Sequence, residues 1–145
     1  MSAKRRLVVV GNGMAGARLV EDVLARAGDR FEITVFGDEP HGNYNRILLS
    51  SVLAGSHAPA DIFINPVSWY AANGVTLHAG VRVDAIDVTA KQATGANGIV
   101  ESYDALVIAT GSRVVVPPIT GVFDAAGRFR DGVFVFRTLD DCDRM

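Results

Sequence analysis

A glycine pattern directly after a short apolar run is the feature that most constrains the fold. Leu7–Val10 is rich in β-branched residues, and the sequence Gly-Asn-Gly-Met-Ala-Gly follows it at positions 11–16. Such a run predicts a strand buried on both faces of a parallel sheet. Apolar residues then recur at helical spacing through 17–27, and Gly28 is placed to end that helix. A second buried strand at Ile33–Phe36 completes a β-α-β unit.

In this context the three glycines predict a dinucleotide-binding loop. Gly11 lets the backbone turn sharply, Gly13 removes a side chain that would block a pyrophosphate, and Gly16 lets the helix approach the strand. The free N–H groups and positive dipole end of the helix would face the phosphates. The alternative interpretation is a glycine-rich turn that binds no ligand.

An acidic residue after the second strand is the other expected element of such a site, because it accepts hydrogen bonds from the adenosine ribose. Asp38 lies 22 residues after Gly16, and Glu39 is an adjacent alternative. Arg46 is the only arginine near this strand end, which disfavours a 2′-phosphate there.

Composition limits the remaining possibilities. The chain has 145 residues, is 49% hydrophobic and carries a formal charge of −2, which favours one folded domain and disfavours disorder or general nucleic-acid binding. No apolar run approaches the ~20 residues of a membrane span, and the run after Lys4–Arg6 is too short for a secretory signal. We therefore expect a cytoplasmic protein. The single cysteine, Cys142, and the spacing of the histidines predict no metal site.

Beyond the β-α-β unit, the sequence predicts short helices, a strand-rich meander and a return to the sheet. The expected helices are Arg46–Ala54 and Pro66–Asn73, the second capped by Asn65. The expected strands are Val75–His78, Val81–Val88, Lys91–Ala93, Ile99–Tyr103, Ala105–Ala109 and Gly132–Phe136. Thr138 and Asp141 match a capping box for a last helix that starts at Leu139.

The glycine loop, the turn at Ala109-Thr110-Gly111 and the hairpin between them resemble the FAD domain of flavoprotein reductases with two dinucleotide folds, the pyridine nucleotide-disulfide oxidoreductase-like family. Residues 43–55 and 136–141 resemble, more narrowly, the large subunits of NAD(P)H-dependent nitrite reductases. Electron-transfer subunits of assimilatory nitrate reductases share much of this pattern. The resemblance covers essentially the whole chain, but only the first segment of such a protein.

The resemblance implies an α/β fold: a Rossmann-like FAD-binding domain, with a parallel sheet and helices, and an antiparallel β-meander insertion. Residues 1–137 would form the first segment of the FAD domain. Residues 138–145 would begin a linker or helix towards an NAD(P)-binding domain that this sequence lacks. The implied cofactor-binding residues are Gly11, Asn12, Gly13, Met14, Ala15, Gly16, Asp38, Glu39, Arg46, Val83, Ala109, Thr110, Gly111 and Arg113.

These residues have distinct implied roles. The backbone of Val83 would contact the adenine edge, and Thr110 and Gly111 would form a second turn beside the cofactor. Arg46 would neutralise phosphate charge or stack on the adenine, with a partnerless surface arginine as the alternative. Arg113 would support the same phosphate region. No side chain is expected to act as an acid–base catalyst.

The implied function is the passage of electrons from NAD(P)H through FAD to a downstream redox centre, with the 145-residue segment alone inactive. Ferredoxin or rubredoxin reductases are an alternative, but they often carry a lysine where this chain reads Leu49-Ser50-Ser51. A disulfide-reductase mechanism is excluded because no cysteine precedes Cys142. An NAD-binding domain, or a dinucleotide-binding module without turnover, are further alternatives.

Overall fold

The computed structural model describes residues 3–145 and divides them into two compact units. The first unit comprises residues 3–44 and 63–111, and the second comprises residues 45–62 and 112–145. Within residues 3–145, no helix is both long and apolar enough to cross a membrane.

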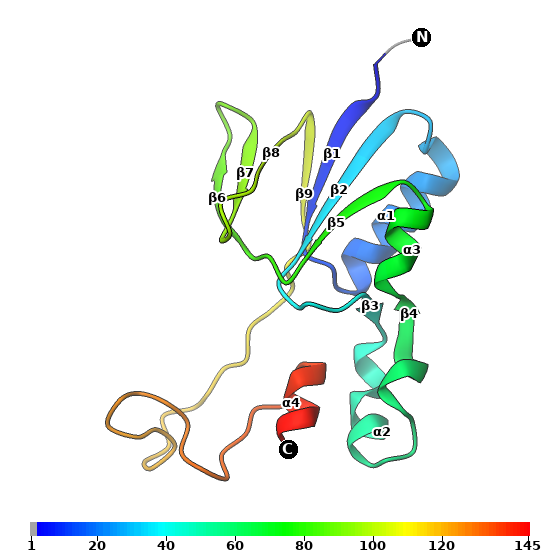
Figure 1. Ribbon diagram of the computed structural model, residues 1–145. Helices are drawn as coiled ribbons and strands as arrows, with labels where there is room; N and C mark the ends of the chain where they lie inside the picture. The colour runs from blue at the N-terminus through cyan, green and yellow to red at the C-terminus, as the bar shows by residue number, and fades with distance from the viewer. Residues whose placement is uncertain (1–2) are drawn as a thin grey trace. The chain divides into compact units, whose positions relative to one another are not determined.

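The first unit is built on a four-stranded parallel sheet (Figure 1). Its strands are β1 (Arg5–Val10), β2 (Phe31–Gly37), β5 (Val75–Ala79) and β9 (Ala105–Ile108), in the order β5-β2-β1-β9. Val10 lies opposite both Phe36 and Ile108, so the carboxyl ends of the three neighbouring strands are level. The predicted strand at the start of the chain and the return to the sheet after the meander are both confirmed.

One face of this sheet is covered by the helices α1 (Met14–Ala27) and α3 (Val67–Ala72), as Figure 1 shows. Because side chains alternate along a strand, Leu7 and Val9 of β1 face this layer. The buried cluster there comprises Leu7, Val9, Val20, Ile33, Val35, Tyr70 and Val75.

A three-stranded antiparallel sheet covers the opposite face. It consists of β6 (Val83–Asp87), β7 (Gln92–Gly95) and β8 (Val100–Ser102), in that order. Val8 and Val10, the alternate residues of β1, join Phe36, Ala93 and Tyr103 in a second buried cluster. The predicted α/β class, with a parallel sheet, helices and an antiparallel insertion, is therefore confirmed.

A small antiparallel pair completes the first unit. β3 (Asn43–Tyr44) pairs with β4 (Phe63–Asn65), and the sequence analysis assigned neither of these strands. Strands of two or three residues carry too little alternation to be identified from sequence alone.

The second unit contains short helical segments and a long irregular connection. The segments are η1 (Arg46–Leu48), α2 (Leu49–Leu53), η2 (Pro59–Ile62) and α4 (Leu139–Arg144). α2 packs against α4, where the Sγ of Cys142 lies 3.7 Å from the carbonyl oxygen of Leu49. In the connection, Phe123 and Phe129 form an isolated antiparallel bridge with stacked rings 5.0 Å apart.

Two local predictions are wrong. Gly132–Phe136 is irregular rather than a strand, because no neighbouring strand in residues 3–145 pairs with it. Asn65 does not cap the third helix: Pro66 stands at the N-cap, and the Asn65 side chain donates to Glu21 instead, with 2.9 Å between Nδ2 and Oε1.

Candidate functional site

The site lies at the carboxyl edge of the parallel sheet, where the strand order reverses. From β1 the chain proceeds outward to β2 and β5, and it then returns to place β9 on the other side of β1. Ligands of open α/β sheets bind outside the carboxyl ends of the strands at such a switch point. The glycine loop follows β1 and Ala109 follows β9, so the predicted loop and turn meet at this point.

Gly11 and Gly16 are required by close contacts between backbone segments. Gly11 has a φ of +112°, and a Cβ there would lie 2.3 Å from the carbonyl oxygen of Ala109. At Gly16, a Cβ would lie 2.1 Å from the carbonyl oxygen of Gly11. These two glycines therefore bring the ends of β1 and β9 and the first turn of α1 together.

Gly13 differs from its two neighbours in the pattern because nothing within the chain requires it. Its φ of −77° suits any residue, and no other heavy atom lies within 4 Å of a Cβ built there. The space in front of Gly13 is therefore open, as a cradle for an external group must be. The Gly13 position fits the diphosphate of a dinucleotide, which needs close approach to the backbone here.

The N-terminus of α1 faces the same space with free donors. Gly13 is the N-cap, no side chain caps the helix, and its first turn carries no acidic residue. The first intrahelical hydrogen bond joins the Ala17 N–H to the Gly13 carbonyl oxygen. The N–H groups of Met14, Ala15 and Gly16 therefore come before the first hydrogen bond of the helix. Together with the helix dipole, these donors attract an anion.

Asn12, between the first two glycines, is held by residues from distant parts of the first unit. The Tyr70 hydroxyl on α3 donates to Asn12 Oδ1 at 2.5 Å, and the Asn43 Nδ2 on β3 donates to the Asn12 carbonyl oxygen at 3.2 Å. Asn12 Nδ2 is buried and has no hydrogen-bond partner within residues 3–145. Burial raises the pKa of the Tyr70 hydroxyl, against the lowering effect of its hydrogen bonds with Asn12 and Asn43, so it stays a donor at neutral pH.

The two acidic candidates after β2 are in different environments. Asp38 is exposed directly after the strand end. Glu39 is half-buried, and its carboxylate accepts a hydrogen bond from the Tyr44 hydroxyl at 2.5 Å. Because the carboxylate of Glu39 is engaged in this bond, Asp38 is the better placed to accept from a ribose.

Val83 begins β6 beside the carboxyl end of β2, where the neighbouring Val81 N–H donates to the Gly37 carbonyl oxygen at 2.8 Å. The Ala96 N–H donates to the Arg82 carbonyl oxygen, so the facing pair of Val83 and Gly95 is of the non-hydrogen-bonded type. The N–H and C=O of Val83 consequently point towards the open edge of β6. This orientation suits the backbone contact with an adenine edge that was predicted for Val83.

Thr110 and Gly111 are exposed directly after β9, and the Ala109 N–H donates to the Val10 carbonyl oxygen at 2.7 Å. The first unit thus contains most of the predicted residues: Gly11, Asn12, Gly13, Met14, Ala15, Gly16, Asp38, Glu39, Val83, Ala109, Thr110 and Gly111.

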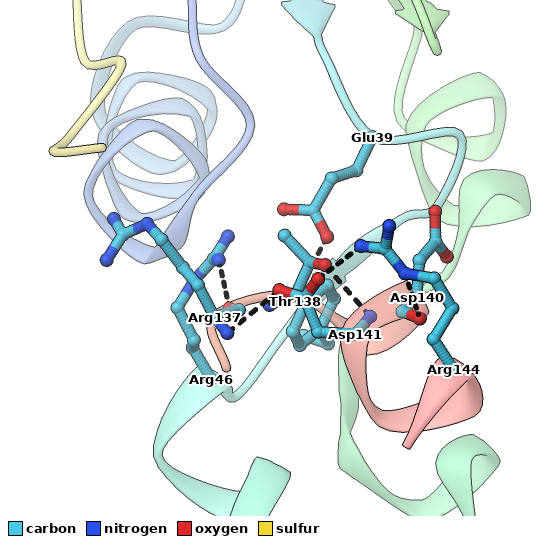
Figure 2. Close-up of polar contacts among 8 residues, drawn as sticks. Glu39, Arg46, Arg137, Thr138, Asp140, Asp141 and Arg144 are labelled. Atoms are coloured by element: carbon cyan, nitrogen blue, oxygen red, sulfur yellow. Dashed lines mark hydrogen bonds and ion pairs between the residues drawn. The ribbon is translucent and has the colours of Figure 1, made fainter. Parts of the chain in front are cut away.

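Arg46 and Arg113 belong to the second unit. The Arg46 Nη1 donates to the carbonyl oxygen of Arg137 at 2.6 Å, just before α4 (Figure 2). Arg113 is exposed in the irregular segment, with no hydrogen bond or ion pair to any of residues 3–145. The interpretation of Arg46 as a partnerless surface side chain is therefore wrong.

Arg137 is followed by the capping box predicted at the start of α4. Thr138 Oγ1 accepts from the Asp141 N–H at 3.1 Å, and Asp141 Oδ2 accepts from the Thr138 N–H at 2.8 Å (Figure 2). The Asp141 carboxylate also accepts from the Arg137 N–H and from Arg144. Burial alone would raise the pKa of Asp141, but these hydrogen bonds outweigh it and hold the pKa below its ordinary value.

Asn43 and the hydroxyl of Tyr70 support the loop and were not predicted from the sequence. Tyr70 is buried in the core. Its hydrogen bond to Asn12 joins residues 58 positions apart, and no local pattern indicates such a pairing. Within residues 3–145, no group of three or more His, Cys, Asp or Glu residues is placed to hold a metal ion.

Comparisons with known proteins extend over nearly the whole chain. Residues 5–145 match the family model described as pyridine nucleotide-disulphide oxidoreductase. The assimilatory nitrate reductase electron transfer subunit of Bacillus subtilis is 46% identical over 142 residues, covering 98% of this chain. The nitrite reductase [NAD(P)H] of the same organism is 43% identical over 142 residues, also covering 98% of this chain.

Among solved structures, a covalent putidaredoxin reductase–putidaredoxin complex is similar to this chain with a TM-score of 0.84 and 29% identity. That match covers 98% of this chain and 33% of the solved one. The chain spans 18% of the Bacillus subtilis nitrate reductase subunit and 17% of the nitrite reductase.

Proposed function

Because the chain belongs to the pyridine nucleotide-disulphide oxidoreductase family, we propose that it is the FAD-binding part of an NAD(P)H-dependent oxidoreductase. The observation that carries this proposal is the open space at Gly13. A glycine that neither the backbone conformation nor the packing of the chain requires lies at the first free donors of α1. A diphosphate is the group that needs this residue to be glycine.

The first unit supplies residues for each part of the cofactor. The amides of Gly13, Met14 and Ala15 would bind the diphosphate, and the exposed carboxylate of Asp38 would accept from the adenosine ribose. The backbone of Val83 would contact the adenine edge. Ala109, Thr110 and Gly111 would form the second turn, and Arg46 and Arg113 are proposed as further phosphate partners.

FAD, when bound, supplies the hydride and electron chemistry, and the protein contributes binding, orientation and electronic tuning. We assign the intact protein to the nitrite reductase type, with NAD(P)H as donor and a downstream redox centre as acceptor. The two Bacillus subtilis relatives, an NAD(P)H nitrite reductase and a nitrate reductase electron transfer subunit, support this assignment. Residues 1–137 would form the FAD segment, and residues 138–145 the start of the connection to an NAD(P)-binding domain.

A ferredoxin- or rubredoxin-reductase type is the second candidate, favoured by the similarity to putidaredoxin reductase. Leu49-Ser50-Ser51, at the start of α2, argues against it because these reductases often carry a lysine after the Leu-Ser pair. The two candidates share the FAD site. They differ in the acceptor to which a full-length protein passes electrons, so acceptor-dependent NADH oxidation separates them.

Calorimetric titration of the chain with FAD and, separately, with NADH tests the FAD assignment. We expect one FAD per chain and much weaker binding of NADH. A preference for NADH would instead support an NAD-binding domain. A chain that binds neither would contradict the proposed function.

A further inference from the structure

We propose that Asn43 and Tyr70 are positioning residues that turn the Gly13 N–H outward, into the place where the diphosphate binds; this inference rests on the function proposed above. Neither side chain is placed to touch the cofactor. Both act through Asn12, the residue between the first two glycines.

The geometry of one peptide group carries the argument. The peptide between Asn12 and Gly13 is trans, so its C=O and N–H point in opposite directions. Asn43 Nδ2 holds the Asn12 carbonyl oxygen on the protein side at 3.2 Å. The Gly13 N–H must then point away from Asn43, and no group within residues 3–145 accepts a hydrogen bond from it. A Cβ built at Gly13 meets nothing within 4 Å, so this residue borders open space.

Tyr70 holds the side chain of Asn12. Its hydroxyl donates to Asn12 Oδ1 at 2.5 Å. Tyr70 and Asn43 are almost fully buried, at 1% and 2% exposed, so neighbouring atoms restrict the motion of both side chains. Asn12 is thus held through its side chain and through its carbonyl group at once.

This arrangement has a free-energy cost. Asn12 Nδ2 is buried without a hydrogen-bond partner, and leaving such a donor unpaired is unfavourable. Asn12 Oδ1, by contrast, accepts from the buried Tyr70 hydroxyl. Asparagine at this position is explained if the orientation of the loop, set through Oδ1 and the backbone carbonyl, matters for binding.

Two substitutions each remove one hydrogen bond to Asn12, and each has a matched control. Asn43→Asp replaces the Nδ2 donor by an oxygen that faces the Asn12 carbonyl, and Tyr70→Phe removes only the hydroxyl. Asn73→Asp removes a hydrogen bond of the same kind, from a side-chain amide to the Trp69 carbonyl oxygen, at the exposed end of α3. Tyr103→Phe removes a buried hydroxyl whose 3.4 Å bond to the Asp87 carbonyl is remote from the loop.

The first measurement is made on the chain without nucleotide: the ¹⁵N–¹H resonance of Gly13 and the exchange rate of its amide hydrogen. We expect both to change in Asn43→Asp and Tyr70→Phe, and to match the wild type in the two controls. The second measurement is the dissociation constant for FAD, determined by calorimetry on folded protein. We expect it to rise about tenfold in each of the two variants, the effect of one buried hydrogen bond.

The outcomes separate the two proposals. An unchanged Gly13 amide in folded Tyr70→Phe and Asn43→Asp overturns the positioning role, as does a lower melting temperature with an unchanged dissociation constant. If Asn43→Asp does not fold, Tyr70→Phe decides alone because it deletes a single atom. A wild-type chain that ignores FAD contradicts the proposed function, and the Gly13 amide in the variants still decides the positioning role.

Discussion

At the scale of single residues, the glycines at positions 11, 13 and 16 have different roles, and substitution can separate them. Gly11 and Gly16 stand where backbone segments touch, whereas Gly13 borders open space. The first two are therefore requirements of the fold, and we propose that the third is a requirement of the ligand.

Gly13→Ala is expected to leave the fold intact while removing FAD affinity. Alanine adopts a φ of −77° without strain, and it restricts the unfolded chain, so the free energy of unfolding should stay equal or rise by about 0.4–1 kcal/mol. The new methyl group would occupy the place of the diphosphate. Urea unfolding and FAD titration measure the two effects. Undiminished FAD binding in this variant would contradict the role of Gly13.

Gly16→Ala is expected to show the opposite pattern. Its Cβ would overlap the backbone carbonyl oxygen of Gly11, which cannot move without disturbing the contact between β1 and β9. Overpacking of this kind destabilises by about 1–3 kcal/mol, so the urea midpoint should fall even without nucleotide. A midpoint equal to that of the wild type would show that α1 does not approach β1 as described.

At the scale of elements, α4 depends on the charge of Asp141. Asp141→Asn should lower the free energy of unfolding at pH 7 by about 1–3 kcal/mol, because a neutral amide cannot accept all the donors that the carboxylate accepts. Asp143→Asn, at an exposed position of the same helix, is the matched control and should have little effect.

The same carboxylate predicts a pH dependence of stability. Its pKa is lower in the folded chain than in the unfolded chain, so its contribution is complete above the unfolded value of about 3.9. That contribution is lost as the pH falls through the lower, folded pKa. The difference in stability between the wild type and Asp141→Asn should therefore shrink in strong acid. A difference that persists there would contradict the assignment, and urea unfolding at several pH values measures it.

Most elements were predictable because their signals are local. The buried strand, the glycine loop and the helix that follows occupy one continuous stretch, and the capping box needs only Thr138 and Asp141. The strand predicted at Gly132–Phe136 is wrong because an alternating apolar run indicates the faces of a strand but not whether a partner strand exists. The helix cap predicted at Asn65 is wrong because the Asn65 side chain forms a hydrogen bond with Glu21, a residue distant in the sequence, instead of capping the helix.

At the scale of the whole molecule, the order of the strands and the supports of the loop could not be read from the sequence. Both depend on contacts between distant segments: β9 with β1, and Tyr70 with Asn12. The sequence predicts residues for binding, because glycine spacing and an acidic residue after β2 have a direct physical meaning. It did not predict the residues that hold them in place.

A crystal structure determined with FAD tests the central claim most directly. The account predicts the diphosphate within hydrogen-bond distance of the Gly13 and Met14 N–H groups, with the adenosine ribose at Asp38. FAD bound elsewhere, with the space before Gly13 empty or filled by a protein side chain, would contradict it.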